Sequence, residues 1–129
     1  MSHHHGSCLC GGISFEVTGK LREVVACHCT KCRKTSGHFV AATACDDDDL
    51  KFNKLDTLAW YQSSEVAERG FCTRCGSTMF FRPRVGQVTG ILAGTLDGAT
   101  GLKLSRHIHC SSKGDYYEIN DGLEQSPEG

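Results

Sequence analysis

The chain of 129 residues has only two prolines, no long apolar run and almost no excess of charge. Its apolar runs are much shorter than the roughly 20 residues of a membrane-spanning helix. Lys and Arg total 14 and Asp and Glu total 15, a net charge of −1. Electrostatics therefore give no reason to expect nucleic acid or an anionic membrane as a partner. Turns must be set mainly by the 15 glycines.

The sequence also lacks the pattern of a signal peptide. Its first seven residues, MSHHHGS, have the composition of an expression leader, since three histidines precede Gly-Ser. We therefore leave His3, His4 and His5 out of the functional argument. The length that remains predicts a single domain over residues 8–129.

Cysteine is the residue that the chain has in excess, with nine copies. An odd number without a signal peptide argues against a secreted disulfide framework and favours a cytoplasmic protein. The cysteines also occur as C-x-C and C-x-x-C, which are typical of metal and redox sites.

The apolar residues form short runs with the period of a strand. Ile13, Phe15 and Val17 alternate with Ser14 and Glu16. Further strands are predicted at 22–27, 38–45, 58–62, 65–71, 78–82, 87–92, 105–110 and 116–119, and one helix at 30–37. Many short strands predict a mainly β fold of compact antiparallel sheets. The acidic run at 46–49 predicts a solvated loop, because a calcium site needs alternating ligands and a turn glycine.

Four cysteines have the spacing of a closed zinc site. Cys8 and Cys10 lie at i and i+2 of an extended chain, so both sulfurs can reach one ion. Cys72 and Cys75 form a C-x-x-C turn that Gly76 follows. Together they predict a structural zinc that ties the N-terminal strand to the middle of the chain. Buried free thiols or a disulfide are the alternatives.

The stretch CHCTKC places three more cysteines, Cys27, Cys29 and Cys32, within six positions. Three protein ligands would leave a fourth tetrahedral position for water or a substrate thiol, as in a catalytic zinc site. A closed zinc site completed by a histidine, Cys45 or Cys110 is one alternative, and a Cys29–Cys32 redox dithiol is another. Basic residues that favour thiolates flank the cysteines, namely Lys31, Arg33, Lys34 and Arg74.

Isolated residues carry weaker signals. His28 lies between two expected ligands, so it should point away from them and lie behind the site or at the surface. His107 and His109 alternate and are expected to share a face, and His107 is a candidate acid–base group. Cys45 and Cys110 are expected to be small buried apolar residues.

Four stretches together resemble the glutathione-dependent formaldehyde-activating enzyme family, which includes the centromere protein V branch. They are CLCGGISFEV, CHCTKCRKTSG, RGFCTRCGS and HIHCSSKGDYYEINDGLEQSPE. The resemblance implies a mainly β fold similar to methionine sulfoxide reductase B and a Rab-binding zinc chaperone. It also implies a structural zinc on Cys8, Cys10, Cys72 and Cys75 and a second, catalytic and more labile zinc on Cys27, Cys29 and Cys32.

The implied activity is that of a carbon–sulfur lyase, in which glutathione or another small thiol adds to formaldehyde or a related aldehyde. His109 and the stretch GDYY at 114–117 depart from the family's pattern, and the aromatic content of this stretch predicts that it lines the substrate pocket. Two other functions stay open: a non-catalytic zinc module that binds a protein, and a sulfoxide reductase with Cys110 as its reactive thiol.

Overall fold

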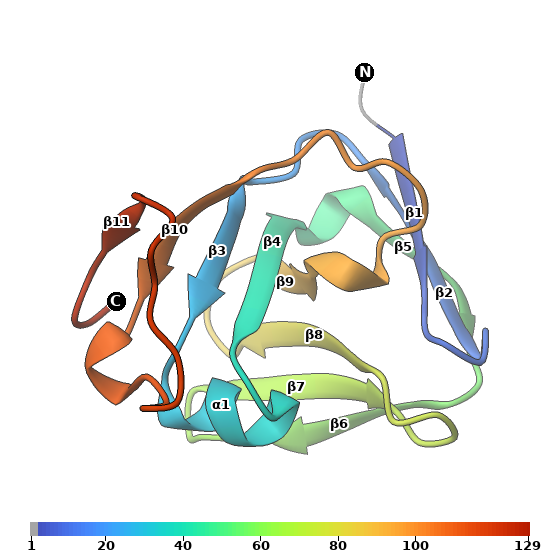
Figure 1. Ribbon diagram of the computed structural model, residues 1–129. Helices are drawn as coiled ribbons and strands as arrows, with labels where there is room; N and C mark the ends of the chain where they lie inside the picture. Colours follow the sequence, from blue (N-terminus) through green and yellow to red (C-terminus); the bar gives the residue numbers. More distant parts are fainter. Residues whose placement is uncertain (1–2) are drawn as a thin grey trace.

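The computed structural model describes residues 3–129 and has eleven strands in this range in two sheets (Figure 1). The smaller sheet has the order β1-β2-β5 and the larger one β11-β10-β3-β4-β9-β8-β7-β6. The strands are β1 His3–Ser7, β2 Ile13–Thr18, β3 Val24–Cys27, β4 Val40–Asp46, β5 Leu50–Leu55, β6 Leu58–Gln62, β7 Ala67–Cys72, β8 Thr78–Pro83, β9 Val88–Leu92, β10 Leu104–Ile108 and β11 Glu124–Gln125. The helix is α1, Thr30–Ser36, and the 3₁₀ turns are η1 Asp47–Asp49, η2 Ala93–Thr95 and η3 Cys110–Ser112.

A mainly β fold is confirmed, but the expected antiparallel arrangement is only partly right. β10 runs parallel to both β3 and β11, so the large sheet is mixed. The strand predicted at 58–62 and the helix at 30–37 are found, whereas the strand predicted at 116–119 is absent. The acidic run forms the end of β4 and the turn η1. Similarity to the reductase and the chaperone stays a prediction.

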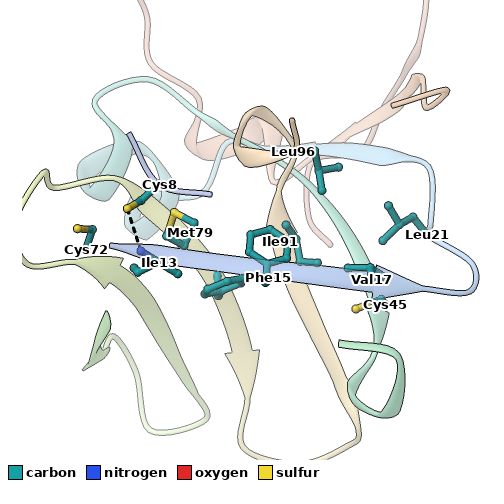
Figure 2. Close-up of a cluster of buried hydrophobic side chains, with 11 residues drawn as sticks. Cys8, Ile13, Phe15, Val17, Leu21, Cys45, Cys72, Met79, Ile91 and Leu96 are labelled. Carbon is teal, nitrogen blue, oxygen red and sulfur yellow. Dashed lines mark hydrogen bonds between the residues drawn. The ribbon is translucent and has the colours of Figure 1, made fainter. Parts of the chain in front are cut away.

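The core lies between the small sheet and one face of the large sheet (Figure 2). Ile13, Phe15 and Val17 of β2 are fully buried, as their alternation predicts. The edge of the Phe15 ring contacts the Phe80 ring of β8, with 5.2 Å between their centroids. Cys45 of β4 also lies in this core, as predicted for a small apolar residue.

Residues 3–7 take part in the fold, although the sequence suggested a leader there. β1 pairs antiparallel with β2 from His3 opposite Thr18 to Ser7 opposite Ser14. Met1 and Ser2 lie outside the described residues, and the division into a leader at 1–7 and a domain at 8–129 stays a prediction. Within residues 3–129, no helix combines the length and apolar composition needed to cross a bilayer.

We expect Gly6→Ala to destabilise the protein, because β1 approaches the core too closely for a side chain. A Cβ at Gly6 would lie 2.1 Å from Cζ of the buried Phe15 ring. Overpacking of this kind costs about 1–3 kcal/mol of unfolding free energy, which denaturant titration would measure. Gly94→Ala is the matched control, since no atom lies within 4 Å of a Cβ built there. Equal stability of the two variants would contradict the docking of β1.

Candidate metal centres and cavity

The structure brings Cys8, Cys10, Cys72 and Cys75 together from two distant parts of the chain. Their sulfurs lie within 4.8 Å of one another, and all four thiols are free. The sulfur of Cys10 is 3.7 Å from that of Cys8 and 3.6 Å from that of Cys72. A tetrahedral zinc with bonds of about 2.3 Å places its sulfur ligands about 3.8 Å apart, so the group fits this ion.

Hydrogen-bond donors surround the same sulfurs. The amide of Ile13 donates to Cys8 at 3.3 Å (Figure 2). The amide of Cys75 donates to Cys72 at 3.3 Å. Arg74 Nε donates to Cys10 at 3.2 Å, so one of the basic residues singled out by the sequence contacts a ligand. The hydrogen bond with Ser77 lowers the pKa of Cys75 to about 5. These donors favour the thiolate form of the sulfurs that accept them, whereas burial raises the pKa of Cys8.

Cys27, Cys29 and Cys32 form a second group at the junction of β3 and α1. Their sulfurs also lie within 4.8 Å of one another. Cys27 is the last residue of β3. Cys29 is the N-cap of α1, and its sulfur accepts a hydrogen bond from the amide of Cys32 at 3.3 Å. Within residues 3–129, neither Cys45, Cys110 nor a histidine joins this group, so the donor set fits a metal with one position left for another ligand.

Arg69 is a functional candidate that the sequence argument missed. It is 6% exposed and approaches the sulfur of Cys32 with both Nη atoms at 3.7 Å. Its guanidinium carbon lies 5.1 Å from the centroid of the Phe81 ring. Contact with the Cys27 thiol, together with the nearby Arg69 charge, lowers the pKa of Cys32 to about 5. The signal that could have identified it is the strand period, which places Arg69 on the same face of β7 as Ala67 and Phe71.

The three-cysteine group borders a cavity of about 770 Å³. Lys31, Arg69 and His109 are among the lining residues, whereas His107 and the aromatic stretch 114–117 are not. The expectation that His107 and His109 share a face is therefore wrong. His109 has a φ of 55° and leaves the strand direction, so the alternation of β10 ends before it.

His107 and His28 belong to a buried hydrogen-bond chain outside the cavity. His28 Nδ1 lies 2.5 Å from the Tyr117 hydroxyl, and His28 Nε2 lies 2.9 Å from His107 Nδ1. His107 Nε2 lies 2.7 Å from the Asp121 carboxylate. A chain in which Tyr117 donates to His28, His28 to His107 and His107 to Asp121 satisfies every bond with His28 neutral. Burial lowers the pKa of His28 to about 4, which agrees with this arrangement.

The chain explains where the aromatic stretch goes. Tyr117 packs against His28, and the Tyr116 hydroxyl lies 2.6 Å from His38 Nδ1. Residues 114–117 therefore anchor the C-terminal segment behind the cysteine group, and the expectation that they line the pocket is not supported by this geometry. His28 is 1% exposed. It therefore lies behind the site rather than at the surface, which were the two positions expected for it.

His3, His5 and Glu16 form a third group that could hold a metal. His3 and His5 lie on one face of β1, and His3 Nε2 is 2.7 Å from a Glu16 oxygen. This group is at the surface, so any measurement of metal content must account for it.

Comparison with known proteins shows the family of the chain. The profile of the family described as glutathione-dependent formaldehyde-activating enzyme matches residues 3–112. A protein of Schizosaccharomyces pombe named an uncharacterized lyase is 28% identical over 121 residues, which cover 92% of this chain and 87% of that protein. A crystal structure of a Rhodobacter sphaeroides protein superposes with a TM-score of 0.61 at 26% identity, over 75% of this chain and 91% of the other. The chain belongs to the glutathione-dependent formaldehyde-activating enzyme family.

Proposed function

We propose that the protein is a zinc-dependent carbon–sulfur lyase that joins glutathione, or another small thiol, to formaldehyde or a related aldehyde. In the forward direction a new bond forms between the thiol sulfur and the carbonyl carbon, and the thiol proton ends on the new hydroxyl oxygen. The reverse reaction cleaves the S-hydroxymethyl adduct. The observation that carries the proposal is a group of three cysteines, without a fourth protein ligand in residues 3–129, at the border of a cavity.

The two cysteine groups receive different roles. We assign a structural zinc to Cys8, Cys10, Cys72 and Cys75 and a catalytic, more labile zinc to Cys27, Cys29 and Cys32. When bound at the second group, zinc supplies a Lewis acid that lowers the pKa of a substrate thiol and polarises a carbonyl oxygen. The family membership and the name of the yeast relative support a lyase.

The positive charge of Arg69 would stabilise negatively charged sulfurs at the three-cysteine group. Three thiolates and a divalent ion carry a net charge of −1, and a substrate thiolate would add a second negative charge. The Arg69 guanidinium offsets part of this charge because it lies 3.7 Å from the sulfur of Cys32. It also favours ligands that arrive as anions over neutral ones.

His107 is better suited to positioning than to proton donation. Both of its ring nitrogens are engaged, one by His28 and the other by Asp121, and it does not line the cavity. It holds His28, which lies between Cys27 and Cys29 in the chain. Cys110 is half-buried, and burial raises the pKa of its thiol, so its environment does not favour a reactive thiol of a sulfoxide reductase.

The direct test is an NMR exchange measurement of S-hydroxymethylglutathione formation above the spontaneous rate, combined with metal content. Both should be measured in a His3→Ala/His5→Ala background, which removes the third metal-binding group. Catalysis that requires the second metal supports the proposal. Two firmly held metals without catalysis or thiol binding would instead indicate a zinc module for a protein partner, and thiol-dependent disulfide formation would indicate a redox dithiol.

We expect Cys72→Ser and Cys29→Ser to have different effects. Structural zinc contributes about 10–16 kcal/mol in small metal-dependent domains, more than most domains have in reserve, so Cys72→Ser should unfold the protein. Cys29→Ser should keep the fold but lose one metal and the activity. Circular dichroism and metal analysis would separate these results, and an unchanged thermal midpoint in Cys72→Ser would refute the structural assignment.

We expect Arg69→Gln to weaken metal binding at the three-cysteine group. Loss of the adjacent cation raises the pKa of Cys32, and changes next to metal ligands typically cost about 10–100-fold in affinity or activity. Competition with a chromophoric chelator would measure the affinity of each site. Arg74→Gln is the matched control, because Arg74 contacts Cys10 and should affect only the four-cysteine group. The assignment fails if both variants weaken the same site.

We expect Asp121→Asn to accelerate release of the labile metal, by up to about tenfold. Asn no longer accepts the charge-assisted hydrogen bond of His107 in the same way, so the chain through His28 loosens behind Cys27 and Cys29. Release to a chelator should be unchanged at the four-cysteine group. Asp115→Asn, a change at an exposed position of the same C-terminal segment, is the control. Identical release rates in wild type and Asp121→Asn would exclude a positioning role for the chain.

A further inference from the structure

The wall of the large cavity is mostly apolar, and strand alternation explains why. Val40, Ala42 and Ala44 of β4 line it, whereas Cys45, the residue after Ala44, lies in the core on the opposite face (Figure 2). The same alternation brings apolar side chains from the other central strands to this face of the large sheet. They are Val25 of β3, Ala67 of β7, Phe81 and Pro83 of β8, Val88 of β9 and Ile108 of β10.

The charges of the cavity have one dominant sign. Four basic residues line it and face one carboxylate, that of Glu23. The basic residues are Arg22, Lys31, Arg69 and Arg106. Arg69 is the buried one among them, and its Nε has no hydrogen-bond partner within the described chain. A buried guanidinium with an unused donor beside thiolates favours an anionic ligand.

Formaldehyde alone does not account for this cavity. It is a small, polar and strongly hydrated molecule without an apolar group, so it would gain nothing from the walls on β4, β8 and β9. An apolar surface that stays wetted in both the free and the bound state is unfavourable, and cavities of this size usually bury most of their ligand. The walls therefore indicate a substrate that carries an apolar substituent of its own.

We propose that the cavity binds the apolar chain of an aldehyde larger than formaldehyde, with an anionic thiol as the second reactant. This inference rests on the proposed function and names the substrate class of the same site. The thiol R′S–H adds to R–CHO to give R′S–CH(OH)–R: the C–S bond forms, the C=O π bond breaks, and the thiol proton passes to the oxygen. No oxidant or reductant is needed. The group R lies along Val40, Ala42 and Ala44, away from the cysteine sulfurs.

The first experiment compares kcat/KM for formaldehyde, propanal, butanal and hexanal with glutathione. Burial of each methylene should raise kcat/KM by about fourfold until the chain fills the cavity. A flat or falling series with active formaldehyde turnover would overturn the substrate class and leave the proposed function intact. Absence of turnover with every aldehyde would overturn both.

A matched pair of variants tests where the chain lies. Ala42 and Ala41 are adjacent on β4, are both half-buried and point to opposite faces of the sheet. Ala42→Leu should lower the ratio of kcat/KM for hexanal to that for formaldehyde by about tenfold or more, whereas Ala41→Leu should leave the ratio unchanged. The ratio does not depend on how much enzyme is folded, so a loss of stability cannot mimic the effect. An equal ratio in both variants would place the chain elsewhere and overturn the proposal.

A binding measurement gives a readout that needs no turnover. Calorimetry with S-methylglutathione and S-hexylglutathione compares ligands that differ only in apolar length. S-hexylglutathione should bind at least about tenfold more tightly, since several methylenes leave water. Equal affinity, or a dimer in light scattering that closes the cavity and abolishes binding, would overturn the proposal.

Discussion

The contact that joins Cys8 and Cys10 to Cys72 and Cys75 is the constraint on which the rest of the fold depends. Sulfurs 62 residues apart lie 3.6 Å from each other. This contact fixes the small sheet against β7 and β8, and so determines which face of the large sheet the β2 side chains cover. The distances among the four sulfurs, and the hydrogen-bond donors around them, fit a metal ion that this group could hold.

Because one face of the large sheet is covered, the period of two places alternate residues of its central strands on the core side or on the cavity side. Cys45 and Ile91 fall on the covered face, and Val40, Ala42 and Ala44 fall on the other. The large sheet bends between β4 and β8 (Figure 1), and this second face borders the cavity of about 770 Å³. The three-cysteine group lies at its border because Cys27 ends β3 and Cys32 belongs to the helix that follows.

The parts that could be predicted from sequence are those encoded by short spacing. C-x-C, C-x-x-C and the alternation around Phe15 are local patterns, and the structure brings together both expected cysteine groups. Arg69, Tyr117 and Asp121 reach their partners through strand register and a long C-terminal segment, which no local pattern specifies. At His109 the sequence pattern predicted too much. It continues the strand alternation of His107, but His109 has a positive φ and β10 ends before it.

Strand β7 connects the two cysteine groups physically. Cys72 belongs to the four-cysteine group on the core side of the sheet. Arg69, three residues earlier, lies on the opposite face beside Cys32. A shift of β7 that relaxed the first group would therefore move the guanidinium at the second. In the proposed function, the four-cysteine group would require rigidity, whereas the three-cysteine group would require an unused position and a nearby cation for the incoming sulfur. Because β7 carries both Cys72 and Arg69, the stability of the four-cysteine group would then maintain the geometry of the proposed three-cysteine site.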